Sequence, residues 1–349
     1  MADTMKPSTH TLCFGVIGID HRHIYHLIQG LLDAGAVCAG YVAESTDPKV
    51  LEGVLERFGQ LPVCQHADEL LQNPRIQLIV SAAVPAQRAD IAIAAMLHGK
   101  DVLVDKPGVT TADQLRRVRD VAAQTGRIFS ICFSERHIVP AVQEALKWVH
   151  QGAIGTPIQT LGIGPHRLNA AIRPSWFFDN AQFGGILVDI ASHQIDQFLA
   201  FTASQQAEVV HSHVGHYGDD PAHPSFENFG EIILQSPGHR GYIRVDWFTP
   251  DGLPTWGDGR LFVMGTHGSI EVRKYIDIGG RPGNNHVFLT DQTSTRHIDC
   301  SQAPLDFFRL LVNDICERSH TCMTQDHVFA VCELSLRAQS LAMERKALR

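Results

Sequence analysis

Short apolar runs alternate with longer amphipathic segments over the first 133 residues. Five runs have the length of buried strands, and the segments between them have the spacing of helices: 12–18, 36–42, 76–82, 101–104 and 128–133. Strands that alternate with helices of about ten to fifteen residues form crossover units, which build a parallel sheet covered on both faces. We therefore expect an N-terminal dinucleotide-binding domain over residues 1–133, with a doubly wound, Rossmann-type sheet.

Residues 134–349 follow another pattern. After a helix at 140–151, strand-like segments follow in close succession and are joined by Gly, Pro and Asp turns: 158–163, 208–214, 231–234, 242–247, 261–264 and 269–272. Such a succession with few helices is typical of a largely antiparallel sheet. Two helices, 304–318 and 327–345, end the chain. We expect an α+β domain built on a large, open, mostly antiparallel sheet that serves substrate binding and oligomerisation.

Composition excludes several classes of partner. The net charge of −8 offers no basic stripe for nucleic acid. The longest apolar stretches are strand-sized, so no membrane span is expected, and residues 1–11 lack the apolar core of a secretory signal. The eight cysteines stand singly, without C-x-x-C, which indicates a reducing compartment and no disulfide framework. The expected location is the cytoplasm.

Two segments place ionisable groups where the pattern buries apolar ones. Lys106 ends the run 101–104 and precedes Pro107. Asp189, His193 and Asp196 are spaced i, i+4, i+7, so one helix would put them on one face. Ionisable groups rarely stay in such surroundings unless something holds them. The segments suggest a proton-transfer site with Asp196 as a structural hydrogen-bonder, although a buried histidine and aspartate can also be only a satisfied core pair.

The first strand ends at Gly18, where a Rossmann domain holds a pyrophosphate on a helix N-terminus. The G-x-G-x-x-G fingerprint would place glycines at 20 and 23, but this chain has Asp20 and His23. We interpret Asp20 as the cap of a helix that begins near Arg22. Glu44, which ends the second strand, can accept hydrogen bonds from the ribose hydroxyls of adenosine and repel a 2′-phosphate, or it can open a solvated loop.

Three motifs carry a family resemblance. The segment 99–107 is similar to G-K-x-V-x-x-E-K-P, 184–196 is similar to G-G-x-x-x-D-x-x-x-H-x-x-D, and 265–270 resembles G-T-x-G-x. In this order and spacing they resemble the Gfo/Idh/MocA (glucose–fructose oxidoreductase / inositol dehydrogenase) family of NAD(P)-dependent sugar and cyclitol oxidoreductases, over nearly the whole chain. The departures are Asp105 for glutamate, Asp20 and His23 for glycines, and Val84 for threonine.

The resemblance implies roles for individual residues. Lys106 corresponds to the lysine that contacts nicotinamide and substrate, His193 to the catalytic acid/base, and Asp189 to the carboxylate that orients beside it. The implied cofactor is NAD, with NADP as the alternative, held by Gly18, Ile19, Asp20, His23, Glu44, Pro85, Lys106 and Pro107. The implied reaction is hydride transfer between nicotinamide and a secondary hydroxyl of a sugar, cyclitol or sugar acid. The implied assembly is a homodimer or homotetramer.

Substrate contacts are expected from Arg136, His166 and Trp176, and the arginines at 136, 167 and 173 hint at an anionic sugar such as a uronate. Histidines gather in the segments 21–26 and 211–216. No third ligand is fixed by the sequence, and no metal is expected. The alternatives are a non-redox lyase or hydrolase, or a metal-assisted sugar-modifying enzyme, on the same scaffold. A non-catalytic sugar- or nucleotide-binding regulator is a third, which the intact Lys106 and His193 argue against.

Overall fold

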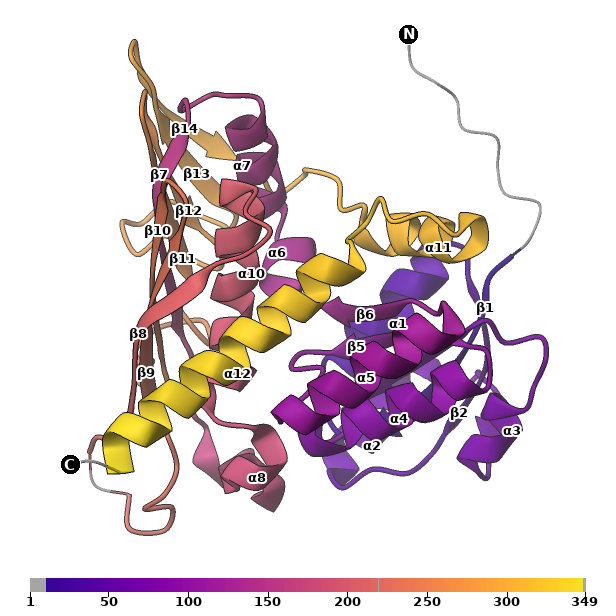
Figure 1. The fold of residues 1–349 in the computed structure, drawn as a ribbon. Coiled ribbons are helices and arrows are strands. Elements are labelled where there is room, and N and C mark those ends of the chain that lie inside the picture. The colour runs from indigo at the N-terminus through magenta and orange to yellow at the C-terminus, as the bar shows by residue number, and fades with distance from the viewer. Residues whose placement is uncertain (1–10, 219, 348–349) are drawn as a thin grey trace, which may run out of the picture. The chain divides into compact units, whose positions relative to one another are not determined.

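The computed structural model describes residues 11–218 and 220–347, which form two compact units (Figure 1). The first unit comprises the chain up to Gly108, Arg116–Ile131 and Asp306–Val328. The second comprises Val109–Leu115, Cys132–Leu305 and the chain from Phe329 onward. The segment 306–328 thus folds with the first unit, although a division after residue 133 places it in the second domain. That division remains a prediction.

The first unit contains a six-stranded parallel sheet in the order β3-β2-β1-β4-β5-β6. Its strands are β1 (Cys13–Ile19), β2 (Val37–Val42), β3 (Val63–Cys64), β4 (Leu78–Ala82), β5 (Asp101–Asp105) and β6 (Phe129–Cys132). Every residue of β4, β5 and β6 is buried, as expected for strands covered on both faces. The predicted Rossmann-type sheet is confirmed. Strand β3 was not predicted because two residues are too short to show a pattern.

The helices of the first unit are α1 (Ile24–Asp33), α2 (Pro48–Phe58), α3 (Ala67–Leu71), α4 (Pro85–Leu97), α5 (Ala112–Thr125) and α11 (Phe307–Glu317). Helix α2 has the Asp47 side chain as its N-cap and a proline in its first turn, a strong start signal. Helix α11 packs on α1 at Gly30, where the Phe308 ring lies 2.2 Å from the position a Cβ would take. Gly30 therefore explains how α11 docks on this unit.

The second unit contains an eight-stranded sheet in the order β14-β13-β12-β11-β7-β10-β9-β8. Its strands are β7 (Pro157–Pro165), β8 (Glu208–Gly215), β9 (Phe229–Ser236), β10 (His239–Asp246), β11 (Arg260–Gly265), β12 (Ser269–Arg273), β13 (His286–Thr290) and β14 (Thr295–Asp299). The pairs are antiparallel except β7 with β10. The predicted mostly antiparallel sheet is confirmed, with β13 and β14 in addition.

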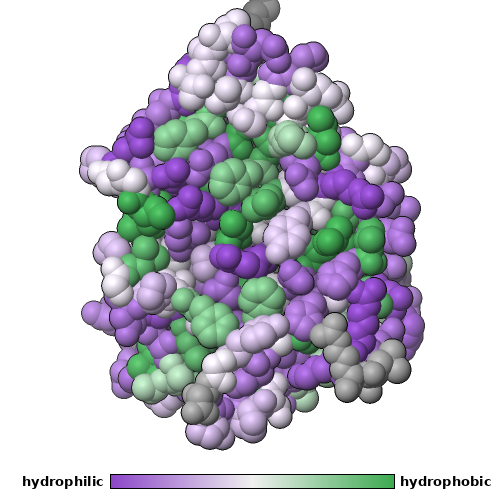
Figure 2. All heavy atoms as spheres, turned by 90° about the vertical axis from the view of Figure 1, so that its left-hand side faces the viewer, coloured by the Kyte–Doolittle hydropathy of each residue, from purple (hydrophilic) through white to green (hydrophobic). Residues whose placement is uncertain are grey.

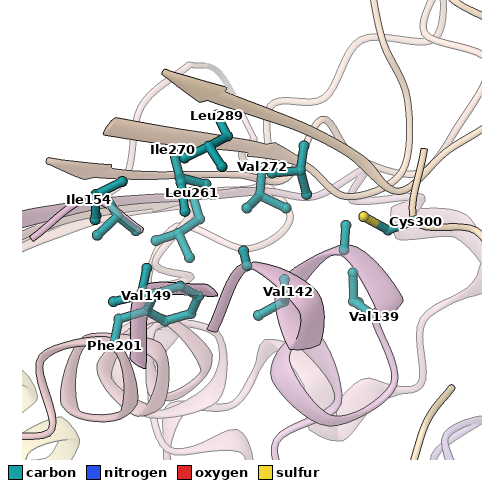
Figure 3. Close-up of a cluster of buried hydrophobic side chains, with 14 residues drawn as sticks. Val139, Val142, Val149, Ile154, Phe201, Leu261, Ile270, Val272, Leu289 and Cys300 are labelled. Carbon is teal, nitrogen blue, oxygen red and sulfur yellow. The ribbon is translucent and has the colours of Figure 1, made fainter. Parts of the chain in front are cut away.

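The second unit also contains helices. They are α6 (Ser134–His137), α7 (Pro140–His150), α8 (Asn180–Phe183), α9 (Ile186–Asp189), α10 (Ala191–Thr202) and α12 (Gln325–Ala347), of which α12 begins in the first unit. Figure 3 shows the core between the sheet, α7 and α10, where Val142 and Val149 of α7 and Phe201 of α10 meet Leu261 and Val272 of the sheet. No helix within residues 11–218 and 220–347 is long and apolar enough to span a membrane.

Candidate functional site

Gly18 shapes the carboxyl edge of the first unit's sheet. Its φ of +85° lies in the left-handed region, and a Cβ there would lie 2.5 Å from the Cβ of Ala83. Only glycine fits, so the end of β1 lies directly against the residues that follow β4. This close approach is the backbone cradle that a dinucleotide site requires.

Asp20 joins two loops at this edge. Its Oδ1 accepts hydrogen bonds from the backbone N–H of Thr46 at 2.5 Å and from the Thr46 hydroxyl at 2.8 Å. Its Oδ2 accepts one from the backbone N–H of Val84 at 3.3 Å. The expectation that Asp20 caps the first helix is wrong, because α1 has His23 at its N-cap position and no side-chain cap. Donors from neighbouring loops satisfy the carboxylate instead.

A cavity of about 460 Å³ opens beside Gly18 and Asp20. Glu44, exposed after β2, also lines it, with Thr46 of the next loop. The start of α1 carries no acidic side chain in its first turn and no side-chain cap, so it suits an anion. The cradle at Gly18, the cavity with Glu44 and the uncapped helix start together fit an NAD molecule.

Asp105 ends β5 and is fully buried. The Nδ1 atoms of His23 and His21 lie 2.8 and 3.1 Å from its two carboxylate oxygens. The Arg88 guanidinium lies 3.2 Å from Oδ2. Burial would raise the pKa of Asp105, but the charges of His23 and Arg88 and the imidazole hydrogen bonds hold it well below 3.8. Asp105 is therefore an ionised carboxylate at neutral pH, with His23, one of the residues that replace glycine, bound to it.

Arg88 is buried in α4 and also donates to backbone carbonyl oxygens of Ala83, Asp105, Lys106 and Pro107. It therefore fixes the backbone from which Lys106 projects. The Lys106 side chain is itself only 5% exposed. The peptide bond between Lys106 and Pro107 is cis.

The eight predicted cofactor residues lie in the first unit, in or directly after its strands. Ile19 ends β1, and Pro85 begins α4 after β4. Because the strands are parallel, their carboxyl ends meet at one edge of the sheet. The structure thus brings the predicted set together at the edge where such sheets bind ligands.

One group of the described residues could offer three metal ligands within 4.8 Å of one another, namely His21, His23 and Asp105. The Nδ1 atoms of both imidazoles already face the carboxylate, and Arg88 supplies a cation at its Oδ2. We therefore interpret the group as an ion-pair cluster. The other histidine segment does not converge: His211, His213 and His216 contact Glu231, Tyr217 and the carbonyl of Phe226, respectively.

The second unit carries His193, whose side chain is 2% exposed. The helix expected over Asp189, His193 and Asp196 is divided: α9 ends at Asp189 and α10 begins after Ile190. Asp189 is buried at the junction. Asp196 forms a two-pronged ion pair with Arg136, at 2.6 Å to each oxygen. The predicted structural hydrogen-bonding role of Asp196 is confirmed.

Glu135, beside Arg136, was not identified from the sequence. Its Oε2 accepts hydrogen bonds from Lys274 and, at 3.0 Å, from Gln194 Nε2. Burial would raise its pKa, but the charges of Lys274, His193 and His166 lower the pKa of Glu135 to about 2. A carboxylate directly after the apolar run 128–133 was the available signal. No pattern links it to Lys274, 139 residues away.

Aromatic rings surround His166. Its ring centroid lies 5.2 Å from that of Trp247 and 4.6 Å from that of Trp256, which lies 4.4 Å from Tyr275. Burial and the charge of Glu135 raise the pKa of Tyr275 well above 10, so its hydroxyl stays protonated. The Trp176 ring lies 6.1 Å from that of Phe177, which in turn lies 5.1 Å from that of Trp247. Of the predicted substrate contacts, His166 is close enough to Glu135 for its charge to lower the pKa of that carboxyl, and Arg136 directly follows Glu135 in the chain.

Replacing Arg88 with glutamine should destabilise the protein in a pH-dependent way. At pH 7 we expect a loss of about 3–5 kcal/mol, because Asp105 would be a buried charge without its guanidinium partner. Because folding lowers the pKa of Asp105, its ionised carboxylate stabilises the fold at pH values above 3.8. This stabilisation is lost progressively as the pH falls from 3.8 toward the lower pKa of the folded state. The difference in the free energy of unfolding between variant and wild type should therefore be smaller at pH 3 than at pH 7. Urea unfolding at both pH values would measure it.

The matched control is Arg117→Gln, which removes an exposed ion pair with Asp90 in the same unit. It should cost less than about 1 kcal/mol at either pH. Equal, small losses for both variants at pH 7 would contradict the role given to Arg88.

Comparisons with known proteins agree with this architecture. Residues 14–133 match the family model described as "Oxidoreductase family, NAD-binding Rossmann fold", and residues 142–271 match the GFO/IDH/MocA C-terminal domain. The chain is 25% identical over 302 residues to scyllo-inositol 2-dehydrogenase (NAD(+)) of Bacillus subtilis, covering 82% of each chain. It is 28% identical over 158 residues to levoglucosan dehydrogenase of Pseudarthrobacter phenanthrenivorans, covering 44% of this chain and 40% of that one.

Among solved structures, one from Erwinia carotovora atroseptica, described as a presumed oxidoreductase, has 41% identity and a TM-score of 0.91, covering 95% of this chain and 99% of the other. Levoglucosan dehydrogenase in complex with NADH and levoglucosan shares the fold, at a TM-score of 0.78 and 17% identity over 96% of this chain and 98% of the other. The predicted fold class and NAD cofactor are confirmed. The chain belongs to the Gfo/Idh/MocA family of NAD-binding oxidoreductases.

Proposed function

We propose that this NAD-dependent dehydrogenase transfers a hydride between nicotinamide and a secondary hydroxyl of a neutral sugar or cyclitol. The observation that carries the proposal is the burial of His193 in the unit joined to an NAD-binding unit, in which strand β5 ends at Asp105 and is followed by Lys106 and Pro107. Relatives named for inositol, levoglucosan and D-xylose support the substrate class. No observation favours a lyase, a hydrolase or a metal-assisted enzyme.

Each proposed catalytic residue has a task that its chemistry suits. When bound, NAD supplies the hydride acceptor. His193 removes the proton of the reacting hydroxyl, since imidazole titrates near neutrality in its ordinary state. Lys106 donates a hydrogen bond to the substrate oxygen and so stabilises the charge that develops there. Asp189, at the end of α9, orients groups beside His193.

The arginines near the site favour a neutral substrate. Arg136 is held by Asp196. Arg167 donates to backbone carbonyls of residues 250 and 253. Arg173 donates to the carbonyl of residue 168 and stacks on Phe177. Because these guanidinium groups have protein partners, they support a neutral polyol better than the uronate suggested by the sequence.

Lys106→Met and His193→Ala should each lower the rate of NAD reduction about a hundredfold or more, the usual size of a general acid–base contribution. The candidate substrates to assay are scyllo-inositol, myo-inositol, D-xylose, D-glucose and levoglucosan. D-Glucuronate completes this polyol panel as its anionic member. NADH formation measures activity, and melting temperature checks folding. Lys147→Met, on the exposed surface of α7, is the control. Full activity in either catalytic variant with the native substrate would sink the assignment.

Glu44 should make NAD the preferred cofactor, because a carboxylate facing a 2′-phosphate is a repulsive contact of the kind that specificity uses. In Glu44→Ser, the dissociation constant for NADP should fall toward that for NAD, as titration of each cofactor would measure. Glu52→Ser, at an exposed position of α2, should leave both constants unchanged. Tighter binding of NADP than of NAD by the wild type would show that Glu44 has another role.

We further propose a homodimer or homotetramer formed through the sheet face opposite α7 and α10. Figure 2 looks onto that side, where hydrophobic side chains lie among hydrophilic ones. Along the strands of this sheet, half-buried residues alternate with buried ones. The half-buried apolar residues are Leu161, Ile163, Ile233, Tyr242, Phe262 and Phe288. Apolar side chains gathered on a surface often mark a protein–protein interface. Light scattering of the wild-type protein should give a mass at least twice that of one chain, 38.5 kDa. Phe262→Glu should lower this mass. A monomeric wild type would contradict the proposed assembly.

A cytoplasmic location also remains a proposal. It rests on the eight cysteines: each is free in the structure, as expected in a reducing compartment.

A further inference from the structure

Two buried glutamates of the second unit differ in how their oxygens are satisfied. Glu227 has partners on both: Oε1 accepts from Asn180 and Gln339, and Oε2 accepts from Gln339 and the backbone N–H of Ile186. Burial raises the pKa of Glu227. Glu227 therefore links α8, α9 and α12 through hydrogen bonds.

Glu135 is ionised, but only its Oε2 has donors. Its Oε1 is fully buried and has no hydrogen-bond partner among residues 11–218 and 220–347. The Oε1 of Gln194, whose amide nitrogen binds Glu135, is also buried without a partner there. A buried acceptor without a donor costs about 1–3 kcal/mol, and more when it is charged. These two acceptors belong to side chains that are hydrogen-bonded to each other.

The missing partner must donate hydrogen bonds. A carboxylate or phosphate is an anion at neutral pH and would be repelled by the ionised Glu135. Lys274 already supplies the cation. A hydroxyl group is the neutral donor that fits, and the proposed substrates carry several.

The backbone around this cluster makes room for it. A Cβ on Gly162 or Gly164 of β7 would lie 2.8 Å from the side chain of Gln194. A Cβ on Gly259 would lie 2.8 Å from the ring of Tyr275. Glu135 is close enough to His193 and His166 for their charges to affect it. The acceptors thus lie near the proposed acid/base, beside rings of the kind that line ligand pockets.

We propose that Glu135 and Gln194, with Lys274 as counter-ion, form a subsite that binds a second hydroxyl of the substrate, next to the hydroxyl whose proton His193 removes. The proposal rests on the proposed function and assigns one of the groups by which the substrate is recognised. The substrate carries a hydroxyl on a carbon neighbouring the reacting one. Simple secondary alcohols, which lack it, are excluded.

Glu135→Gln tests the subsite, because glutamine keeps the shape and removes the negative charge. With the best substrate of the polyol panel, KM should rise about 10- to 100-fold, the equivalent of a hydrogen bond to a charged group. The value of kcat should change less than about threefold. Calorimetric titration of the same polyol into the protein should show a matching loss of affinity. Glu227→Gln, the matched buried control, should lower the melting temperature and leave KM unchanged.

A second arm uses the wild-type protein and so does not depend on the folding of a variant. The analogue is the same polyol with hydrogen in place of the hydroxyl on the carbon next to the reacting one. Its KM with the wild-type protein should be higher than that of the polyol by a similar factor. Combined with Glu135→Gln, the analogue should add little further loss, because both changes remove one interaction. An unchanged KM for the analogue with wild type overturns the subsite but leaves the dehydrogenase function standing. Absence of NADH formation with every polyol overturns both.

Discussion

The compensated burial of Asp105 is the interaction on which the first unit's site depends. A carboxylate at the end of a central strand is stable there only if cations and hydrogen-bond donors surround it. Arg88 from α4 and two histidines from the turn after β1 provide them. Arg88 also holds the carbonyl oxygens around Lys106. One charge thus fixes the turn after β1, the start of α4 and the backbone around Lys106.

This arrangement explains how the loop tolerates the loss of two glycines. Gly18 keeps the one position where a side chain would collide with Ala83. Asp20 turns to donors at Thr46 and Val84, and His23 turns to Asp105. The loop is therefore fixed by side-chain contacts in addition to the approach of the backbone. The second unit uses the same kind of compensation, pairing Glu135 with Lys274 and Arg136 with Asp196.

Much of this could be predicted from the sequence, because strand and helix periodicity and the motifs around Lys106 and His193 are local patterns. The contacts of Asp20 could not be predicted, because its partners lie 26 and 64 residues away. Periodicity is a local pattern and gives no information about such distant pairs. Strand β14 is largely exposed, so it shows no apolar alternation. The break at Ile190 and the pairing of Glu135 with Lys274 arise from tertiary packing. They became visible only in the folded chain.

We propose that the altered loop after β1 still holds NAD for the oxidation of a polyol. The most direct test is the melting temperature of the wild-type protein in the presence of oxidised and reduced NAD and NADP. A ligand that binds only the folded state raises the melting temperature by mass action. We expect NAD and NADH to raise it at millimolar concentration, and to do so more than NADP and NADPH. No shift with any of the four would contradict the account.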